Sequence, residues 1–315
     1  MSIFTSIEGL DIKDPDYKFT HGTYGISEFG TKFVRQMLDD TKPDKFADLV
    51  RISGFSHGTD VWLNNAQEFI RSGQATMKEA ISTRDDIMNY LILKGVPKGE
   101  AFNIMEKVRK GKGVTEERVA LMQEHGVPEW YIESCRRIQY MFPRAHAVAY
   151  VTMSFRTAYY KVYYPLAFYA VYFTSKVTDF NWDVIKEGSQ ACLRRMEAIG
   201  LKEKNATAKE KNEMTVLEVC YEMYSRGFTF MAPNLEDSLA CDFTVKDGKV
   251  LVPLSGLDGV GTTVACSIYE EQHKQPFGTI EEIQMRAKAN KTAIEALRLA
   301  GMVDDLPETD QLSLF

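Results

Sequence analysis

The sequence predicts a mainly α-helical protein that ends in a small region of mixed α and β structure. Apolar residues recur at helical spacing through most of residues 28–226, and helix-starting residues precede several of these stretches. Asp247-Gly248 lies between two apolar runs, which is typical of a tight β-hairpin. The chain has 315 residues, 44% hydrophobic and 26% charged, so it can build one large or two moderate domains.

Helices are expected from about residue 28 to residue 140, after a segment rich in turn residues. Residues 41–43 separate the first two helices, and residues 53–59 are expected to form a loop whose small residues let the backbone approach a ligand. Thr83 and Thr115 are expected to lie at helix starts, because acidic residues follow them. The helices are expected near 28–38, at 44–52 and 61–70, from 84, at 101–109, from 115, and at 127–140.

The second half of the chain changes character near residue 236, where we expect a domain boundary. Residues 201–212 are expected to form a charged linker, and residues 214–226 a helix that ends at Gly227. Residues 241–245 and 250–253 are expected to pair as a hairpin, followed by short helices with glycine turns. Further helices are expected at 142–165, 166–173 and 182–198.

The stretch between Pro143 and Pro165 is expected to form one helix of about five turns. His146 and Tyr150 share a face, and the stretch also carries the cations Arg144, Arg156 and Lys161. Such a helix can bury one side and hold a phosphate and a flat base on the other. The alternative is a core helix with solvated charges. The later aromatic residues are expected to be core: Phe155, Tyr159, Tyr160, Tyr163, Tyr164, Phe168 and Tyr169.

A longer pattern runs through this helix. It comprises Phe142, Pro143, Arg144, Ala145, His146, Ala147, Ala149, Tyr150, Tyr159, Lys161, Tyr164 and Pro165. The pattern resembles the finger signature of bacterial replicative DNA polymerases of family C, roughly F-x-K-x-H-A-x-A-Y and then A-Y-x-K-x-x-Y-P. Arg144 stands where lysine is common, which keeps the charge. The resemblance implies that Arg144, His146 and Tyr150 line the nucleotide and template side of a finger domain.

Three other stretches carry candidate nucleotide or template contacts. The basic loop at residues 107–113 holds Lys107, Arg109, Lys110 and Lys112. Charge alone also fits a solvated face, but its glycines and its family resemblance favour contact with DNA or a triphosphate. The resemblance adds Arg84, which otherwise fits an ordinary surface residue, and His57, which otherwise fits a structural loop histidine.

Residues 257–268 resemble a helix-hairpin-helix motif, in which two glycines let the backbone lie against a phosphate. Amides of the hairpin and the following helix start can donate to the phosphate oxygens without reading sequence. The candidate duplex contacts are Gly259, Gly261, Thr262 and Thr263. Asp258 stands where the motif usually has proline, and Thr262-Thr263 lacks the lysine that is common there. The electrostatic contribution to phosphate binding is therefore expected to be weaker. Residues 280–306 indicate a degenerate second hairpin, with a purely structural helix pair as the alternative.

The last five residues resemble the sliding-clamp-binding pentapeptide of bacterial replication proteins, Gln-Leu-x-Leu-Phe. The matching residues are Gln311, Leu312, Leu314 and Phe315. Apolar anchors on an acidic tether lower solubility unless a pocket takes them up. The alternative is a frayed tail that packs on the body of the protein.

No catalytic or metal-binding set is recognisable in the sequence. Transfer of nucleotides by two metals needs closely spaced carboxylates, and the Asp-x-Asp at residues 14–16 contains a proline that argues against a central strand. The five cysteines lack metal-ligand spacing and are expected to be reduced and buried. The net charge of −6 argues against a generic nucleic-acid coat, and no membrane segment or signal peptide is recognisable.

Taken together, the matches resemble the PolC type of family C more than the DnaE type, because the clamp peptide directly follows the hairpins. This resemblance implies a finger domain at 1–236, a β-hairpin with tandem helix-hairpin-helix at 237–306, and a clamp-binding tail at 307–315. It implies primer-template DNA, dNTP and the sliding clamp as partners, with the palm, the thumb and Mg²⁺ belonging to upstream chain. The expected location is the bacterial cytoplasm, at the nucleoid. The alternative is a non-enzymatic adaptor that binds DNA and the clamp.

Overall fold

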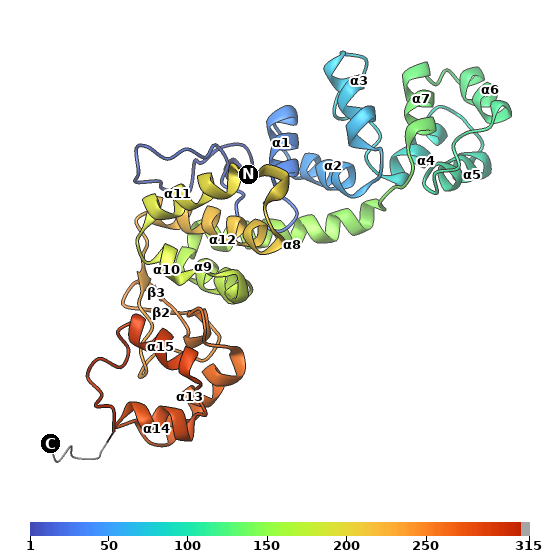
Figure 1. Cartoon of the computed structure of the whole chain (residues 1–315). Helices are drawn as coiled ribbons and strands as arrows, with labels where there is room; N and C mark the ends of the chain where they lie inside the picture. The colour runs from blue at the N-terminus through green and yellow to red at the C-terminus, as the bar shows by residue number, and fades with distance from the viewer. Residues whose placement is uncertain (310–315) are drawn as a thin grey trace. The chain divides into compact units, whose positions relative to one another are not determined.

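The computed structural model describes residues 1–309, which are mainly helical as the sequence predicts (Figure 1). This part of the chain contains fifteen α-helices and one three-stranded sheet. It divides into two compact units. Unit 1 comprises residues 1–6 and 20–158, and unit 2 comprises residues 7–19 and the chain from residue 159 onward. This division falls between residues 158 and 159 and does not test the domain boundary expected near residue 236, which stays a prediction.

Unit 1 is built from seven short helices and most of an eighth. Polar residues start several of them: the Thr31 hydroxyl accepts a hydrogen bond from the backbone N–H of Val34 at 3.3 Å, and Thr115 precedes a first turn with two glutamates. The helices are α1 (Lys32–Thr41), α2 (Phe46–His57), α3 (Gln67–Arg71), α4 (Arg84–Leu93), α5 (Lys98–Val108), α6 (Glu116–Glu124), α7 (Glu129–Arg137) and α8 (Arg144–Tyr163), which continues into unit 2.

The loop predicted at residues 53–59 is wrong for its first five residues, because α2 continues through His57. Gly54 lies inside this helix, where a Cβ atom would come within 2.6 Å of the carbonyl oxygen of Ser82. The glycine therefore allows α2 to pack against the segment before α4, and it does not mark a loop. The chain leaves the helix at Gly58, whose backbone is extended.

The helix predicted at residues 61–70 is interrupted in its first half. Trp62–Ala66 form an irregular π-type turn, in which Asn64 has a left-handed backbone and Asn65 is also far from helical angles. Regular helix begins only at Gln67, with α3. Hydrophobic spacing alone does not reveal such an interruption.

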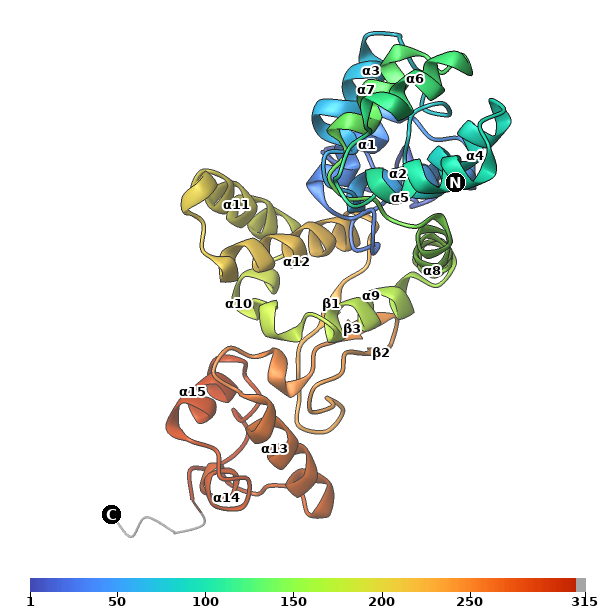
Figure 2. The same cartoon turned by 90° about the vertical axis from the view of Figure 1, so that its right-hand side faces the viewer.

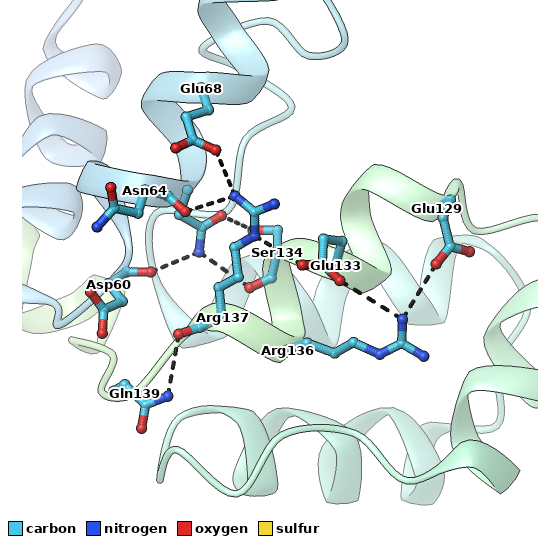
Figure 3. Close-up of polar contacts among 10 residues, drawn as sticks. Asp60, Asn64, Glu68, Glu129, Glu133, Ser134, Arg136, Arg137 and Gln139 are labelled. Carbon is cyan, nitrogen blue, oxygen red and sulfur yellow. Dashed lines mark hydrogen bonds and ion pairs between the residues drawn. The ribbon is translucent and has the colours of Figure 1, made fainter.

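Side chains hold this irregular turn against α7. The buried amide of Asn65 donates to the carbonyl oxygens of Asp60 at 2.7 Å and of Ser134 at 3.2 Å, and its oxygen accepts from the Ser134 hydroxyl at 2.6 Å. Arg137 pairs with Glu68 at 2.7 Å (Figure 3). These bonds replace backbone hydrogen bonds that a regular helix would make.

Unit 2 contains the rest of the helices and the sheet. The helix predicted at 182–198 is split at Gly188, where φ is +90° and a new helix starts. The linker predicted at 201–212 is shorter than expected, because the Thr207 hydroxyl and the Glu210 carboxylate cap a helix there. The helices are α9 (Pro165–Thr174), α10 (Trp182–Ile185), α11 (Ser189–Gly200), α12 (Ala208–Ser225), α13 (Thr262–Lys274), α14 (Ile280–Arg286) and α15 (Lys291–Leu299).

The predicted hairpin is confirmed as β2 (Thr244–Lys246) and β3 (Lys249–Leu251), which pair antiparallel. Asp247 and Gly248 both have positive φ, at +48° and +72°, as a tight two-residue turn requires. A short strand that the sequence did not indicate, β1 (Phe230–Met231), runs parallel to β3, so the strand order is β1-β3-β2.

A buried ionic network lies in the core of unit 2. Lys161 of α8 is fully buried, and its Nζ lies 2.7 Å from Oε1 of Glu222, which is buried as well. The Tyr169 hydroxyl donates to Glu222 at 2.9 Å and accepts from Arg226 at 3.0 Å. Burial raises the pKa of Glu222, and the nearby Lys161 opposes that rise. Lys161, which is part of the pattern through α8, therefore lies in the core and does not face solvent.

The prediction that the aromatic residues from Phe155 to Tyr169 are core is wrong for four tyrosines. Phe168 and Tyr169 of α9 are buried and Phe155 of α8 is half-buried. Four rings at the end of α8 and the N-cap of α9 are more than half exposed: Tyr159, Tyr160, Tyr163 and Tyr164. The helical repeat explains this, because Ser154, Ala158 and Lys161 occupy the buried side.

None of the described helices is long and apolar enough to cross a membrane. All five cysteines are free thiols. Cys135, Cys192 and Cys220 are buried as expected, whereas Cys241 and Cys266 are half-buried. Burial raises the pKa of the Cys135 and Cys220 thiols, so these groups stay protonated near neutral pH.

Candidate nucleic-acid interface

The segment at residues 139–142 joins the predicted nucleotide-contact stretches of unit 1. The backbone N–H of Thr59, just after α2, donates to the carbonyl oxygen of Tyr140 at 2.9 Å. The N–H of Met141 donates to the carbonyl oxygen of Arg109 at 3.3 Å, and the N–H of Arg84 donates to that of Phe142 at 3.3 Å. Three stretches that are distant from one another in sequence thus meet around one short segment before α8.

An aromatic group surrounds Phe142. The His57 ring stacks on Phe142 with a centroid distance of 5.0 Å, and the His146 ring lies edge-on to it at 5.1 Å. Tyr150 lies 5.1 Å from His146, one turn further along α8. His146 and Tyr150 are exposed, so the predicted pair does share an accessible face.

His57 is held in place by a carboxylate that the sequence did not indicate. Its Nε2 lies 3.1 Å from Glu28 Oε2, and its Nδ1 lies 2.9 Å from the carbonyl oxygen of Ser53. Glu28 has a left-handed backbone with φ +69°, which is uncommon for a residue that is not glycine. Both imidazole nitrogens therefore have partners, and the ring presents its face to Phe142.

Arg144 is fixed by two aspartates at the start of α4. Its guanidinium forms an ion pair with Asp86, and its backbone N–H donates to Asp85 Oδ2 at 2.7 Å. Asp86 also accepts from the backbone N–H of Thr83 at 2.9 Å and lies 3.6 Å from Arg51. The sequence showed Asp85 and Asp86 as part of a helix start, but not their contact with Arg144.

The basic loop at residues 107–113 is partly neutralised. Arg109 donates two hydrogen bonds to Glu106, and Lys110 pairs with the same carboxylate at 3.0 Å. The bonds from Arg109, and then those from Lys110, lower the pKa of Glu106 to about 2. Lys107 and Lys112 are exposed and form no ion pair within residues 1–309.

Gly111 brings the basic loop close to the joining segment. Its φ is +67°, and a Cβ atom there would lie 2.6 Å from the carbonyl oxygen of Gln139. Only glycine satisfies both conditions, so the loop position depends on this residue. Arg84 is half-buried, and its guanidinium has no ion-pair partner in the described part of the chain.

In unit 2 the predicted helix-hairpin-helix corresponds to a 3-10 helix at Leu254–Gly256, a turn at residues 257–261 and α13, which Figure 2 labels. Gly259 has φ +97°, and a Cβ atom there would lie 3.2 Å from the Thr292 side chain. Gly261 is the N-cap of α13, and nothing lies within 4 Å of its Cβ direction. Gly261, Thr262 and Thr263 are exposed, and no side chain caps the first-turn amides of this helix. An oxyanion can approach these donors.

The second helix pair, α14 and α15, repeats this local geometry with different residues. Lys288 has φ +53° two positions before the N-cap of α15, which corresponds to Gly259 two positions before the N-cap of α13. The N-cap itself is Asn290, whose side chain accepts from the N–H of Ala293 at 2.9 Å. The start of α15 is therefore capped internally, unlike that of α13.

The clamp-binding residues Gln311, Leu312, Leu314 and Phe315 lie outside the described residues. The preceding chain is well anchored. The backbone N–H of Ile280 donates to the carbonyl oxygen of Pro307 at 3.0 Å, and Arg298 pairs with Glu308 at 2.7 Å. Within residues 1–309, no group of three or more His, Cys, Asp or Glu residues could hold a metal ion.

Comparisons with known proteins identify two matching regions and several similar chains. Residues 5–126 match the family described as the bacterial DNA polymerase III alpha subunit finger domain, and residues 227–312 match a helix-hairpin-helix motif. The chain is 55% identical to the DNA polymerase III PolC-type of Caldanaerobacter subterraneus subsp. tengcongensis, 52% to that of Clostridium perfringens and 47% to that of Bacillus subtilis. Each alignment covers the whole chain but only 22% of the relative. The chain is therefore homologous to the C-terminal part of PolC-type DNA polymerase III, about 22% of its length, which carries the finger domain and the helix-hairpin-helix motif.

Proposed function

We propose that this chain supplies nucleotide and template contacts, a duplex grip and a clamp tether to a replicative DNA-directed DNA polymerase, which adds dNTPs to a primer 3′ end. The observation that carries the proposal is the meeting of His57, Arg84, the basic loop and the start of α8 around residues 139–142. An imidazole, aromatic rings and several cations within one unit match a nucleotide, which combines a flat base with a charged triphosphate.

The cations of this site fall into two groups. Arg84, Lys107 and Lys112 have no carboxylate partner in the described part of the chain and can meet phosphate oxygens directly. Arg109, Lys110 and Arg144 are paired with Glu106 or Asp86, so a phosphate would have to share them or replace the carboxylate. Positioning and charge stabilisation are the main tasks of a protein in phosphoryl transfer, and both groups can contribute.

The helix-hairpin-helix is proposed to hold duplex DNA. The uncapped amides of α13 and the open space beside Gly261 leave room for a backbone phosphate. Contacts of this kind position DNA without reading its sequence. The candidate contacts remain Gly259, Gly261, Thr262 and Thr263, of which Gly259 also has a packing role against Thr292.

The tail is proposed to bind the sliding clamp, and the catalytic carboxylates with their Mg²⁺ are proposed to belong to the palm of the longer protein. The described residues do not offer a metal site, so this chain alone is expected to add no nucleotide. The second candidate, a DNA-binding and clamp-binding adaptor, shares the hairpin and tail but needs no nucleotide site. The aromatic and cationic site around Phe142 favours the polymerase.

Photo-crosslinking tests the proposal on the 315-residue chain. A dNTP that carries a photoreactive base should attach within residues 139–150, and an excess of unlabelled dNTP should prevent the attachment. The matched variant His146→Ala should reduce it, whereas His273→Ala, which removes an imidazole from α13, should not. Attachment spread over the surface, or unaffected by unlabelled dNTP, would favour the adaptor.

A further inference from the structure

Four tyrosines at the junction of α8 and α9 form an exposed aromatic surface on unit 2, here called the tyrosine cluster: Tyr159, Tyr160, Tyr163 and Tyr164. Their exposed fractions are 52%, 55%, 66% and 54%. The rings contact one another, with centroids 4.7 Å apart for Tyr159 and Tyr163, and 5.8 Å apart for Tyr160 and Tyr164. None of the four hydroxyls has a hydrogen-bond partner among the described residues. Packing within the unit therefore does not account for these side chains.

The chain around the tyrosine cluster is strongly biased in charge. From residue 134 to residue 178 it carries six basic residues and no acidic residue, although the whole chain has 44 acidic and 38 basic residues. Arg156 lies one turn before Tyr159 and Tyr160 on the same helix. It is exposed and forms no ion pair within residues 1–309. Four of the six bases, Arg136, Arg137, Arg144 and Lys161, are already paired with carboxylates. Arg156 is therefore the cation that this stretch offers directly beside the cluster.

We propose that the tyrosine cluster binds single-stranded DNA by stacking bases on its rings, with Arg156 meeting the backbone phosphate. Aromatic rings beside a cation are what single-strand binding without sequence preference requires, because every base has a stacking face. The proposal rests on the proposed function in one respect: a polymerase holds an unpaired template ahead of its nucleotide site. It adds a surface that neither the hairpins nor the site around Phe142 includes.

Two other occupants fit the cluster less well. A protein segment would also accept tyrosines, which are enriched in interfaces, but it would not require the unpaired Arg156 one turn before the rings. Duplex DNA presents its phosphates but not its base faces, so four rings would contribute little to binding it. A single strand uses both the rings and the charge.

The test compares two double variants of the 315-residue chain, both made together with Gly261→Val to remove the hairpin contribution. Affinity is measured by fluorescence anisotropy with a labelled oligo-dT of about 12 nucleotides. Tyr160→Ala with Tyr164→Ala should weaken binding about tenfold or more, because two stacking rings are lost. Tyr160→Phe with Tyr164→Phe should keep the affinity, because the rings remain. Phe102→Ala removes an aromatic residue that is 50% exposed on α5 and should have no effect.

The proposal would be overturned if the double alanine variant bound oligo-dT as tightly as Gly261→Val alone. It would also be overturned if the double phenylalanine variant lost as much affinity as the double alanine variant. If the alanine pair fails to fold, wild-type chain is crosslinked instead to an oligonucleotide that contains 5-iodouracil. Crosslinks should then map to residues 156–164, and their absence from this peptide would contradict the proposal. Crosslinking of a photoreactive dNTP is scored separately, so loss of single-strand binding alone would leave the proposed nucleotide site standing.

Discussion

Arg144 at the start of α8 forms an ion pair with Asp86 in the first turn of α4. The same carboxylate accepts hydrogen bonds from the backbone N–H and hydroxyl of Ser82, at 3.0 and 2.6 Å. Asp86 therefore caps one helix while it neutralises the cation that starts the other. A triphosphate carries more negative charge than one carboxylate, so we expect it to draw Arg144 partly away from Asp86. This relationship links the fold of unit 1 to its proposed nucleotide site.

The two hairpin glycines should respond differently to substitution. Gly261→Val places its side chain in open space and should weaken duplex binding without lowering the thermal midpoint. Gly259→Val should lower the midpoint, because φ is +97° there and Thr292 lies close. Anisotropy with a labelled duplex at matched salt and thermal unfolding measure the two effects. Unchanged duplex affinity in Gly261→Val would refute the assignment of this hairpin as a phosphate contact.

Deletion of residues 311–315 should abolish binding to the sliding clamp and leave duplex binding unchanged. Three apolar side chains contribute roughly 1.5–3 kcal/mol each on burial, and ordering a peptide offsets much of this. We therefore expect micromolar affinity, about 8 kcal/mol, which tethering to DNA makes effective. Surface plasmon resonance with immobilised clamp measures it, with Ser313→Ala as the control. Equal binding by the truncated chain would show that the tail is only a frayed end.

Lys161→Met should destabilise the chain by about 3–5 kcal/mol, because it leaves Glu222 buried without its ion-pair partner. Loss of Lys161 should raise the pKa of Glu222 further. A folded-state pKa above the unfolded value favours the fold at low pH, so the variant should lose stability as pH rises through that pKa.

Urea unfolding at several pH values measures this effect. The control is Lys186→Met, which removes a surface ion pair with Asp183 at 2.8 Å and should change stability by less than about 1 kcal/mol. Similar losses in the two variants would mean that the buried network contributes no more than a surface contact.

Glu106→Gln should make the free energy of unfolding less dependent on pH under acidic conditions. Hydrogen bonds from Arg109 and Lys110 lower the pKa of Glu106 from 4.5 to about 2. The resulting stability is present above pH 4.5 and is lost as pH falls toward 2. Wild type should therefore lose more stability than the variant over this range in urea unfolding. The control is Glu124→Gln, which removes an exposed acid without an ion pair in the described chain. Parallel curves for wild type and Glu106→Gln would contradict the prediction.

Local sequence signals predicted those parts of the fold that local chemistry determines. The Asp247-Gly248 turn formed as expected, because both residues tolerate positive φ. Thr115 starts a helix, and the proline-bracketed helix runs from Arg144 to Tyr163. Their dihedral preferences and capping groups act within a few residues, so no tertiary information was needed.

Features that depend on distant residues were predicted poorly. Gly54 suggested a loop, but it serves the approach of α2 to Ser82. The irregular turn at Asn65 depends on Ser134, 69 residues away. The site was predicted as separate stretches, whereas Glu28 and Asp86, which hold His57 and Arg144, carry no recognisable local signal. The spacing of hydrophobic residues shows which residues share a face of a helix, but it does not show which face a neighbouring element covers. For this reason the four exposed tyrosines were wrongly predicted to be core residues.

The central claim is that Arg144 and its neighbours meet the incoming nucleotide. The direct measurement is primer extension by a full-length PolC-type polymerase that contains this chain, over a range of dNTP concentrations. Arg144→Ala should raise the apparent KM for dNTP or lower kcat, while clamp and duplex binding stay intact. The control is Arg136→Ala, which removes a cation whose ion-pair partners within residues 1–309 are three glutamates on α6 and α7. Extension kinetics of Arg144→Ala equal to those of the control would contradict the account.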